Sequence, residues 1–195
     1  MNQILSQTVR QIFFRITIRV VLCAAGLGPI AFGKEVAVSN EYKIKAVFLF
    51  NFIQFTEWPA SSFPDPGAPI RIGVLGQNPF GSALEEAVHG ETAHGRKLVV
   101  QYANRLSELR ECQLIFIGES EKGRIADILK ELASAAILTI SELPEFARQG
   151  GIIRLYNDGR KVRFVINLQA AQRRNLKLDA QLLSLAKIVS TTGSK

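Results

Sequence analysis

Between residues 70 and 140, short apolar runs alternate with amphipathic segments. The run at 114–117 is nearly continuous, which is typical of strands inside a parallel sheet, and 70–75 also reads as a buried strand. Four such strands are predicted, at residues 70–75, 97–102, 114–117 and 136–140. The spacing of apolar residues predicts helices at 80–89, 106–110, 124–133 and 142–149. This alternation predicts βαβ units around a mostly parallel sheet.

The pattern changes after residue 150. Apolar and polar residues alternate at 152–156 and 162–167, on either side of Asn157-Asp158-Gly159. Asp-Gly favours the positive φ of tight turns, so these segments predict an antiparallel β-hairpin. The leucine-rich segment that follows predicts a long C-terminal helix over 168–189. The predicted fold is a single-domain α/β sandwich with a mostly parallel central sheet, a C-terminal hairpin and this helix.

Residues 41–57 predict a helix with two apolar faces, which Asn40 can cap and Pro59 follows. One face carries Ile44, Val47, Phe48, Phe52 and Phe55, and the other carries Ala46, Leu49, Phe50 and Ile53. Such a helix is either deeply buried or covered on one side by a partner, such as a second copy or a client protein. Five of the twelve phenylalanines fall between Phe48 and Phe63, which makes this segment the leading candidate for a binding surface.

The first 33 residues differ from the rest of the chain. Three arginines and no acidic residue precede Lys34, and an apolar run covers 20–32. This layout predicts a cleaved secretory signal over 1–33. The alternative is an uncleaved anchor, but the run is shorter than the roughly 18–20 residues that span a bilayer. The remaining chain divides into a short segment at 34–40, a domain at 41–190 and a tail at 191–195.

Removing the signal changes the charge and the cysteine count. The formal charge falls from +7 to +4, because three arginines leave with the signal, and Cys112 becomes the single thiol. An exported chain with one cysteine forms no internal disulfide, so its stability must come from the hydrophobic core.

Few residues suggest catalysis or metal binding. His89 and His94 are five positions apart and have no third ligand in the pattern, which is typical of a hydrophilic loop. The serines lack the Gly-x-Ser-x-Gly pattern of a nucleophile elbow. The sequence therefore predicts no catalytic residues, no metal site and no cofactor, and hence a protein that is not an enzyme.

A glycine turn follows the first predicted strand. Gly76 and Gly81 have the spacing of a phosphate loop, with Asn78 between them, but the Lys-Ser/Thr of a P-loop is missing. Backbone N–H groups at the start of the next helix could hold an anion. The alternative is a tight turn shaped by glycine and proline, so Gly76, Asn78 and Gly81 are candidate anion-binding residues.

Basic residues gather near the hairpin and the last helix. They are Arg160, Lys161, Arg163, Arg173, Arg174 and Lys177. Nucleic-acid binding requires basic residues interleaved with aromatic ones, whereas the aromatics lie in the first helix, so no nucleic-acid partner is expected. A solvated face and contact with an acidic patch of a protein partner are the two alternatives.

Four blocks of residues together resemble the YfiR-like family of exported bacterial proteins. The first covers 45–52 and continues to Glu57-Trp58-Pro59, and the second covers 72–76 and 78–81. The third covers 112–117 and 137–140, and the fourth covers 146–153 and 162–168. The resemblance spans about 41–190 and depends on the order and spacing of the blocks.

This resemblance implies a non-enzymatic periplasmic regulator with an α/β sandwich fold. It implies repression of an inner-membrane diguanylate cyclase through that enzyme's periplasmic sensor region, and thus less cyclic-di-GMP and biofilm. It also implies release of the repression by an outer-membrane lipoprotein, and dimerisation of some members. The candidate partner-binding residues are Phe50, Phe52, Trp58, Phe146, Gly150, Gly151 and Arg163.

The sequence departs from the family at its cysteines. The resemblance implies a disulfide that would join the position of Gly73 to Cys112, and a second pair near the Gly-Gly block, which is absent here. Internal redox control is therefore not expected, and Cys112 could pair only between chains or with a small thiol. The alternative function is an exported module that binds a nucleotide or an amino acid, because ligand crevices form at strand ends in α/β folds.

Overall fold

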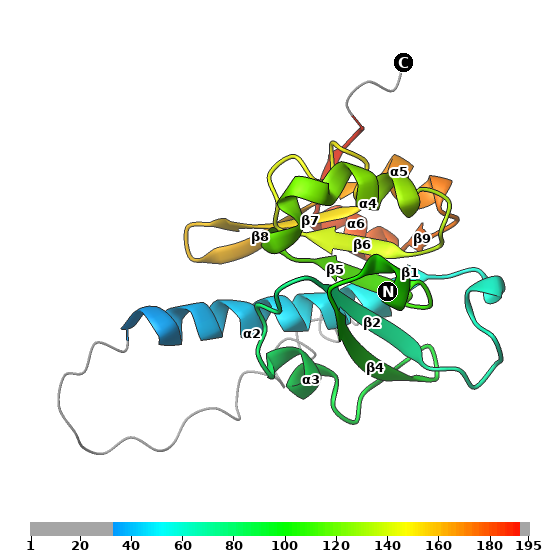
Figure 1. Ribbon diagram of the computed structural model, residues 1–195, viewed down its shortest axis with the longest axis horizontal. Coiled ribbons are helices and arrows are strands. Elements are labelled where there is room, and N and C mark those ends of the chain that lie inside the picture. Colours follow the sequence, from blue (N-terminus) through cyan, green and yellow to red (C-terminus); the bar gives the residue numbers. More distant parts are fainter. Residues whose placement is uncertain (1–32, 192–195) are drawn as a thin grey trace, which may run out of the picture. The chain divides into compact units, whose positions relative to one another are not determined.

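The computed structural model describes residues 33–191, with side chains from residue 40 onward. Within this range, eight strands form one sheet in the order β10-β8-β7-β6-β5-β2-β4-β3 (Figure 1). The strands are β2 (Ile70–Leu75), β3 (Thr92–Ala93), β4 (Arg96–Ala103), β5 (Leu114–Ile117), β6 (Leu138–Ser141), β7 (Ile153–Asp158), β8 (Lys161–Asn167) and β10 (Lys187–Val189). A separate antiparallel pair joins β1 (Thr56–Glu57) to β9 (Lys177–Leu178).

The helices connect and cover these strands. They are α2 (Gly33–Gln54), α3 (Ala83–Val88), α4 (Ile125–Glu131), α5 (Leu168–Arg173) and α6 (Ala180–Leu185). Short 3-10 helices lie at η1 (Ala60–Ser62), η2 (Leu106–Leu109) and η3 (Glu119–Arg124). No helix in the described range is both long and apolar enough to cross a membrane.

The sheet confirms the predicted fold class. Strand β2 pairs in parallel with β4 and β5, β5 pairs with β6, and β6 pairs with β7. Strands β7 and β8 form the predicted antiparallel hairpin, and β10 adds a parallel edge beside β8. Two strands, β2 and β5, have the predicted boundaries.

Two helix predictions are wrong. The long C-terminal helix does not form, because Asn175 ends the α5 segment with a φ of 56° and Asp179 caps a new helix, α6. After Ala186, which is extended, the chain enters β10. The predicted helix at 142–149 is a series of turns, interrupted by Glu145 with a φ of 60°.

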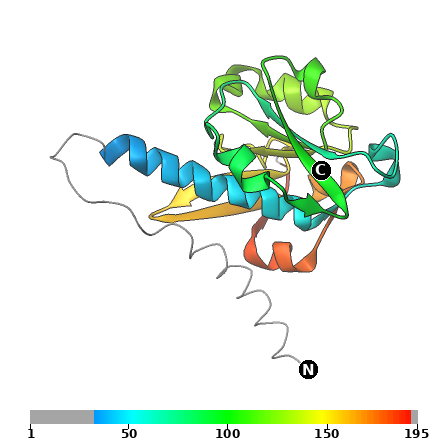
Figure 2. The same ribbon diagram turned by 90° about the horizontal axis from the view of Figure 1, so that it is seen from below.

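The sheet separates two hydrophobic clusters. Leu114 and Phe116 of β5 point to the cluster that includes α2 and α3, whereas Ile115 and Ile117 point to the cluster that includes α4. Figure 1 shows α2 and α3 on one side of the central strands and α4 on the other. Figure 2 shows α2 lying across one face of the sheet. Alternate residues of the buried strands thus supply both layers of the core.

Helix α2 contributes its C-terminal half to the larger cluster. Leu49, Phe52 and Ile53 are buried, and the Phe52 ring lies 5.1 Å from the Phe164 ring of β8. Every residue from 45 to 56 is buried or half-buried. The face with Ala46, Leu49 and Ile53 is therefore deeply buried, whereas Ile44 is exposed and Phe48, Phe50 and Phe55 keep some accessible surface. The predicted signal peptide, 1–33, and the tail, 191–195, lie outside the described residues except for Gly33 and Thr191.

Candidate functional site

A pocket of about 360 Å³ lies at the carboxyl ends of β2, β5 and β6. The loops after these strands line it at 77–79, 119–120 and 142–144, and Tyr42 of α2 contributes another wall. Strands β4 and β5 flank β2 on opposite sides, so the strand order reverses here. Ligands of open α/β sheets bind at such a switch point. The pocket therefore has the location expected of a ligand site.

A buried lysine lies beside this pocket. Lys45 has no exposed surface, and its ammonium group forms ion pairs with the carboxylates of Glu41 and Glu142. The same ammonium group lies 4.7 Å from the centre of the Tyr42 ring. Glu119 adds a further carboxylate to the pocket wall. Two carboxylates pair with this ammonium group and a third lines the pocket, so negative charge exceeds positive charge and the region is unfavourable for an anion.

The ionisation of the cluster follows from its contacts. Burial tends to raise the pKa of Glu41, but hydrogen bonds from Lys45 and Asn157 and the charge of Lys45 outweigh it and lower that pKa. Burial, and then the charge of Glu142, raise the pKa of Tyr42. The cluster thus holds an ionised Glu41 and a neutral phenol.

The glycine turn at 76–81 is stabilised by its own residues. The Asn78 side chain accepts a hydrogen bond from the Phe80 N–H at 2.8 Å and donates one to the Gly81 carbonyl at 3.1 Å. A Cβ at Gly76 would lie 2.6 Å from a carboxylate oxygen of Glu121. The Asn78 side chain is thus engaged within the turn and a carboxylate lies beside Gly76, which disfavours anion binding there, although Gly76, Asn78 and Gly81 remain candidates.

The histidines do not converge with other ligands. Both histidines are exposed, and the Nε2 atom of His94 lies 3.0 Å from the Ile53 carbonyl oxygen. Within the described residues no three histidine, cysteine or acidic side chains are placed to hold a metal ion.

Comparison with known proteins gives the family. A family model described as YfiR/HmsC-like matches residues 42–187. The chain belongs to the YfiR/HmsC-like family. This confirms the resemblance found in the four sequence blocks, and it places the chain among regulatory proteins of the periplasm that act with a partner protein in signalling.

A solved structure supports the fold. The crystal structure of a conserved domain protein from Vibrio cholerae O1 biovar El Tor superposes with a TM-score of 0.51 at 12% sequence identity. The match covers 75% of this chain and 59% of that chain, so the YfiR/HmsC-like chain spans less than two thirds of that protein. At this identity the likeness concerns the fold alone.

Three of the candidate partner-binding residues of this YfiR/HmsC-like domain lie in its core. Phe52 is 1% exposed, Phe146 is fully buried, and Gly151 is buried beneath the Phe146 ring. A partner cannot contact these groups without opening the core, so the interpretation of Phe52, Phe146 and Gly151 as contact residues is wrong.

Four candidates keep accessible surface. Phe50 and Trp58 are half-buried, and the Trp58 indole donates to the Gln113 carbonyl at 3.0 Å. Gly150 has a φ of 101°, which favours glycine in the turn before β7. Arg163 is exposed on the β7–β8 hairpin, where its Nε donates to Asp158 at 2.9 Å.

The thiol that the family pattern retains is buried. Cys112 is a free cysteine with 2% exposure. Burial raises its pKa to about 11, with Arg71 opposing and Glu111 adding to the rise. A buried thiol with a raised pKa is a poor nucleophile and a poor partner for another chain.

The sequence interpretation missed two features of this YfiR/HmsC-like domain. Lys45 was part of a family block but received no role, although a lysine between Ile44 and Ala46 on an apolar helix signals a buried charge. The basic residues were treated as one group, whereas the structure separates the hairpin residues from Arg173 and Arg174, which line a second cavity.

Proposed function

We propose that this protein represses an inner-membrane diguanylate cyclase by binding that enzyme's periplasmic sensor region. The family match over residues 42–187 supports this proposal. In the proposed cycle, the signal at 1–33 delivers the chain to the periplasm, and an outer-membrane lipoprotein sequesters it to release the cyclase. The outputs are lower cyclic-di-GMP and less biofilm while the repressor is free.

The β7–β8 hairpin is the proposed contact surface. Arg160, Lys161 and Arg163 are all exposed there, and the hairpin tip extends beyond the neighbouring strands (Figure 1). Exposed positive charge on a projecting element favours docking on an acidic surface and speeds association. Gly150 lies before the opposite end of β7 and is not part of this surface. We assign Phe50 and Trp58 to a separate contact, for the lipoprotein or a second copy of the chain.

Deletion of the chromosomal gene tests the function. Cellular cyclic-di-GMP should rise in the deletion strain and return to its original level when the wild-type gene is restored. An unchanged level after deletion would overturn the proposal.

A charge-reversal pair tests the surface. Arg163→Glu should restore repression poorly and bind the isolated sensor region at least about tenfold more weakly, because like charges would meet. Lys97→Glu makes the same change at an exposed position on β4 and should act like wild type. Equal binding by both variants, with unchanged thermal unfolding, would exclude the hairpin as the contact.

Binding of a small ligand is a second candidate function. The pocket at the strand ends is surrounded by carboxylates, which disfavours a nucleotide there. A basic cavity between α4 and α5 favours an amino acid or another small carboxylate instead. Thermal-shift measurements with nucleotides and amino acids distinguish these classes, and a shift with nucleotides alone would contradict this assignment.

A further inference from the structure

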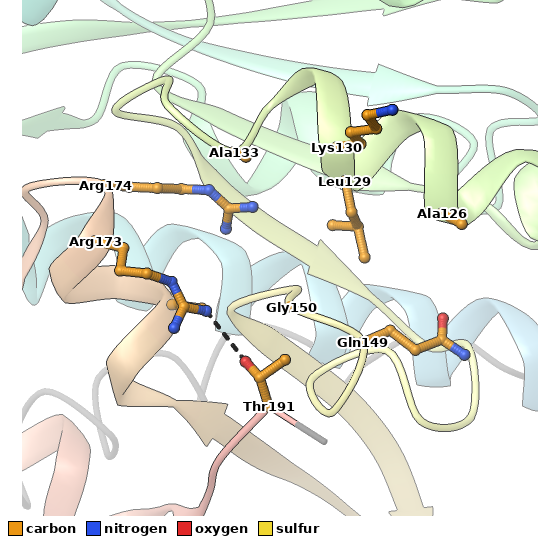
Figure 3. A pocket seen from close by; sticks show the side chains of 10 residues that line it. Ala126, Leu129, Lys130, Ala133, Gln149, Gly150, Arg173, Arg174 and Thr191 are labelled. Carbon is orange, nitrogen blue, oxygen red and sulfur yellow. Dashed lines mark hydrogen bonds between the residues drawn. The ribbon is translucent and has the colours of Figure 1, made fainter. Parts of the chain in front are cut away.

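A second cavity shares no lining residue with the pocket at the strand ends. It encloses about 440 Å³ between α4, the end of α5 and the turn at 149–150 (Figure 3). Lys130, Arg173 and Arg174 line it, and no acidic residue of the described range does. The cavity therefore has a positive potential, unlike the pocket at the strand ends.

Arg174 gives this cavity a buried positive charge. It is only 4% exposed, and its guanidinium group donates to the Leu132 carbonyl at 3.0 Å and to the Thr139 hydroxyl at 3.3 Å. These two bonds use Nε and one hydrogen of Nη1, so donors remain at Nη1 and Nη2. Figure 3 shows the guanidinium group directed into the space between α4 and α5.

Arg174 has no opposite charge in the described part of the chain. Every ion pair found there involves other residues. Burial, and then the neighbouring charge of Arg173, lower the pKa of Arg174 to about 10. A buried charge without a counter-ion is unfavourable, and a bound anion would remove that cost.

Arg173 and Thr191 form the outer wall. The Arg173 Nη2 group donates to the Thr191 hydroxyl at 3.1 Å, as drawn in Figure 3, and the Asn167 amide donates to the same oxygen at 2.9 Å. Because that oxygen accepts two hydrogen bonds, its own hydrogen is available to a ligand. The wall thus offers a second guanidinium group and a hydroxyl donor.

The rest of the cavity is apolar. Leu129 points into it from α4 in Figure 3, Ala126 and Ala133 lie on the same side, and Ala170 of α5 also lines the cavity. An apolar wall opposite two guanidinium groups suits a molecule with an anionic end and a short hydrocarbon part. Inorganic phosphate would leave the apolar side in contact with water.

We propose that this cavity binds a small organic carboxylate. The carboxylate bonds to the free donors of Arg174 and Arg173, in the paired geometry that guanidinium groups form with carboxylates. The aliphatic part of the ligand contacts Leu129 and the alanines. This proposal specifies the second candidate function and does not depend on repression of a cyclase, so repression and carboxylate binding can fail separately.

An isosteric ligand pair tests the charge. The probes are 4-methylpentanoate, its uncharged amide and inorganic phosphate, titrated into 15N-labelled protein purified from cells expressing the full chain. The carboxylate should shift the NMR signals of Ala126, Gly150 and Thr191, with at least about tenfold higher affinity than the amide. Equal affinity of acid and amide, binding of phosphate as tight as that of the acid, or no shifts at millimolar concentration would overturn the proposal.

Replacing Arg174 would also remove its hydrogen bonds to Leu132 and Thr139, so the site is tested with two variants at other cavity residues. Arg173→Ala should weaken carboxylate binding by about tenfold, whereas Arg105→Ala, at an exposed position outside the cavity, should leave it unchanged. Ala126→Phe should fill the cavity and abolish binding while Arg173 and Arg174 remain. Unchanged affinity in both cavity variants would place the ligand elsewhere and refute the site.

Discussion

A Cβ atom at Gly73 would lie 3.1 Å from the Cys112 sulfur. Gly73 belongs to β2, and Cys112 comes just before β5, the parallel neighbour of β2. The family resemblance implied a disulfide between these two positions, and the structure brings them together. The second cysteine is missing, but the geometry that would accept it is present.

Gly73→Cys should therefore form a disulfide with Cys112 under oxidising conditions. Closing a loop of this length should raise the free energy of unfolding by up to roughly 4 kcal/mol, less the cost of crowding Leu109. Denaturant unfolding with and without reductant measures the gain. Gly73→Ser is the control, since it adds the crowding without the bond, and two titratable thiols after oxidation would contradict the prediction.

Gly151→Ala should destabilise the domain by about 1–3 kcal/mol, because overpacking forces side chains from their rotamers. The new Cβ would lie 2.3 Å from the Phe146 ring. Gly123→Ala is the matched control, because nothing lies within 4 Å of its Cβ. Thermal unfolding compares the two, and Phe146→Leu should recover part of the loss in the double variant. Equal melting temperatures for both alanine variants would refute the assignment of Gly151 to packing.

Lys45→Met should lower the free energy of unfolding by about 3 kcal/mol at pH 7, at the low end for breaking a buried ion pair. The substitution leaves Glu41 and Glu142 without their cation. Lys43→Met changes an exposed lysine two positions away and should have little effect. Urea unfolding measures both, and equal effects would contradict a role for the cluster.

Acid should remove the contribution of this cluster. The pKa of Glu41 in the folded protein lies below its ordinary value of 4.5. A depressed pKa stabilises the fold above the unfolded value, and this stabilisation is lost as the pH falls through the folded pKa. The difference between wild type and Lys45→Met should therefore narrow when unfolding is measured below pH 4.5. A constant difference from pH 7 to pH 3 would show that the charge of Glu41 does not matter.

Cys112 should resist modification in the native protein. With a pKa of about 11 instead of 9.0, its thiolate fraction at pH 8 is roughly a hundredfold lower, and burial blocks access as well. A chromogenic thiol reagent should react with it only after unfolding. Complete reaction of the native protein within minutes would contradict this and reopen pairing between chains.

The central sheet could be predicted because its strands are short apolar runs bounded by glycine, proline or polar residues. For β2 and β5 the pattern predicted the observed ends, because every position except the half-buried Arg71 is both apolar and buried. The hairpin followed from Asp158-Gly159 and from alternation along β7 and β8. In these segments the local preference and the tertiary environment agree.

The C-terminal segment could not be predicted because its leucines have helical spacing but different surroundings. Asn175 takes a left-handed conformation, and the N–H of Asp179 donates to the Phe55 carbonyl, 124 positions earlier in the chain. Lys187 to Val189 then pair with β8. These long-range contacts override the helical pattern, and none of them leaves a local signal.

The candidate sites were harder to predict from the sequence than the fold. The aromatic residues of α2 suggested an interface, because sequence cannot show that Phe164 covers Phe52. The cavity beside Arg174 brings together α4, a turn and α5, so only the fold reveals that its charges converge.

The contact between Phe52 and Phe164 cannot form until β8 has been synthesised. The aromatic half of α2 leaves the ribosome long before β8, its partner in the core. At roughly 5–20 residues per second, the intervening 112 residues take about 6–22 s to make. During that interval Phe48 and Phe52 lack their contacts with Phe164, so the nascent chain exposes part of an apolar helix face that chaperones can bind.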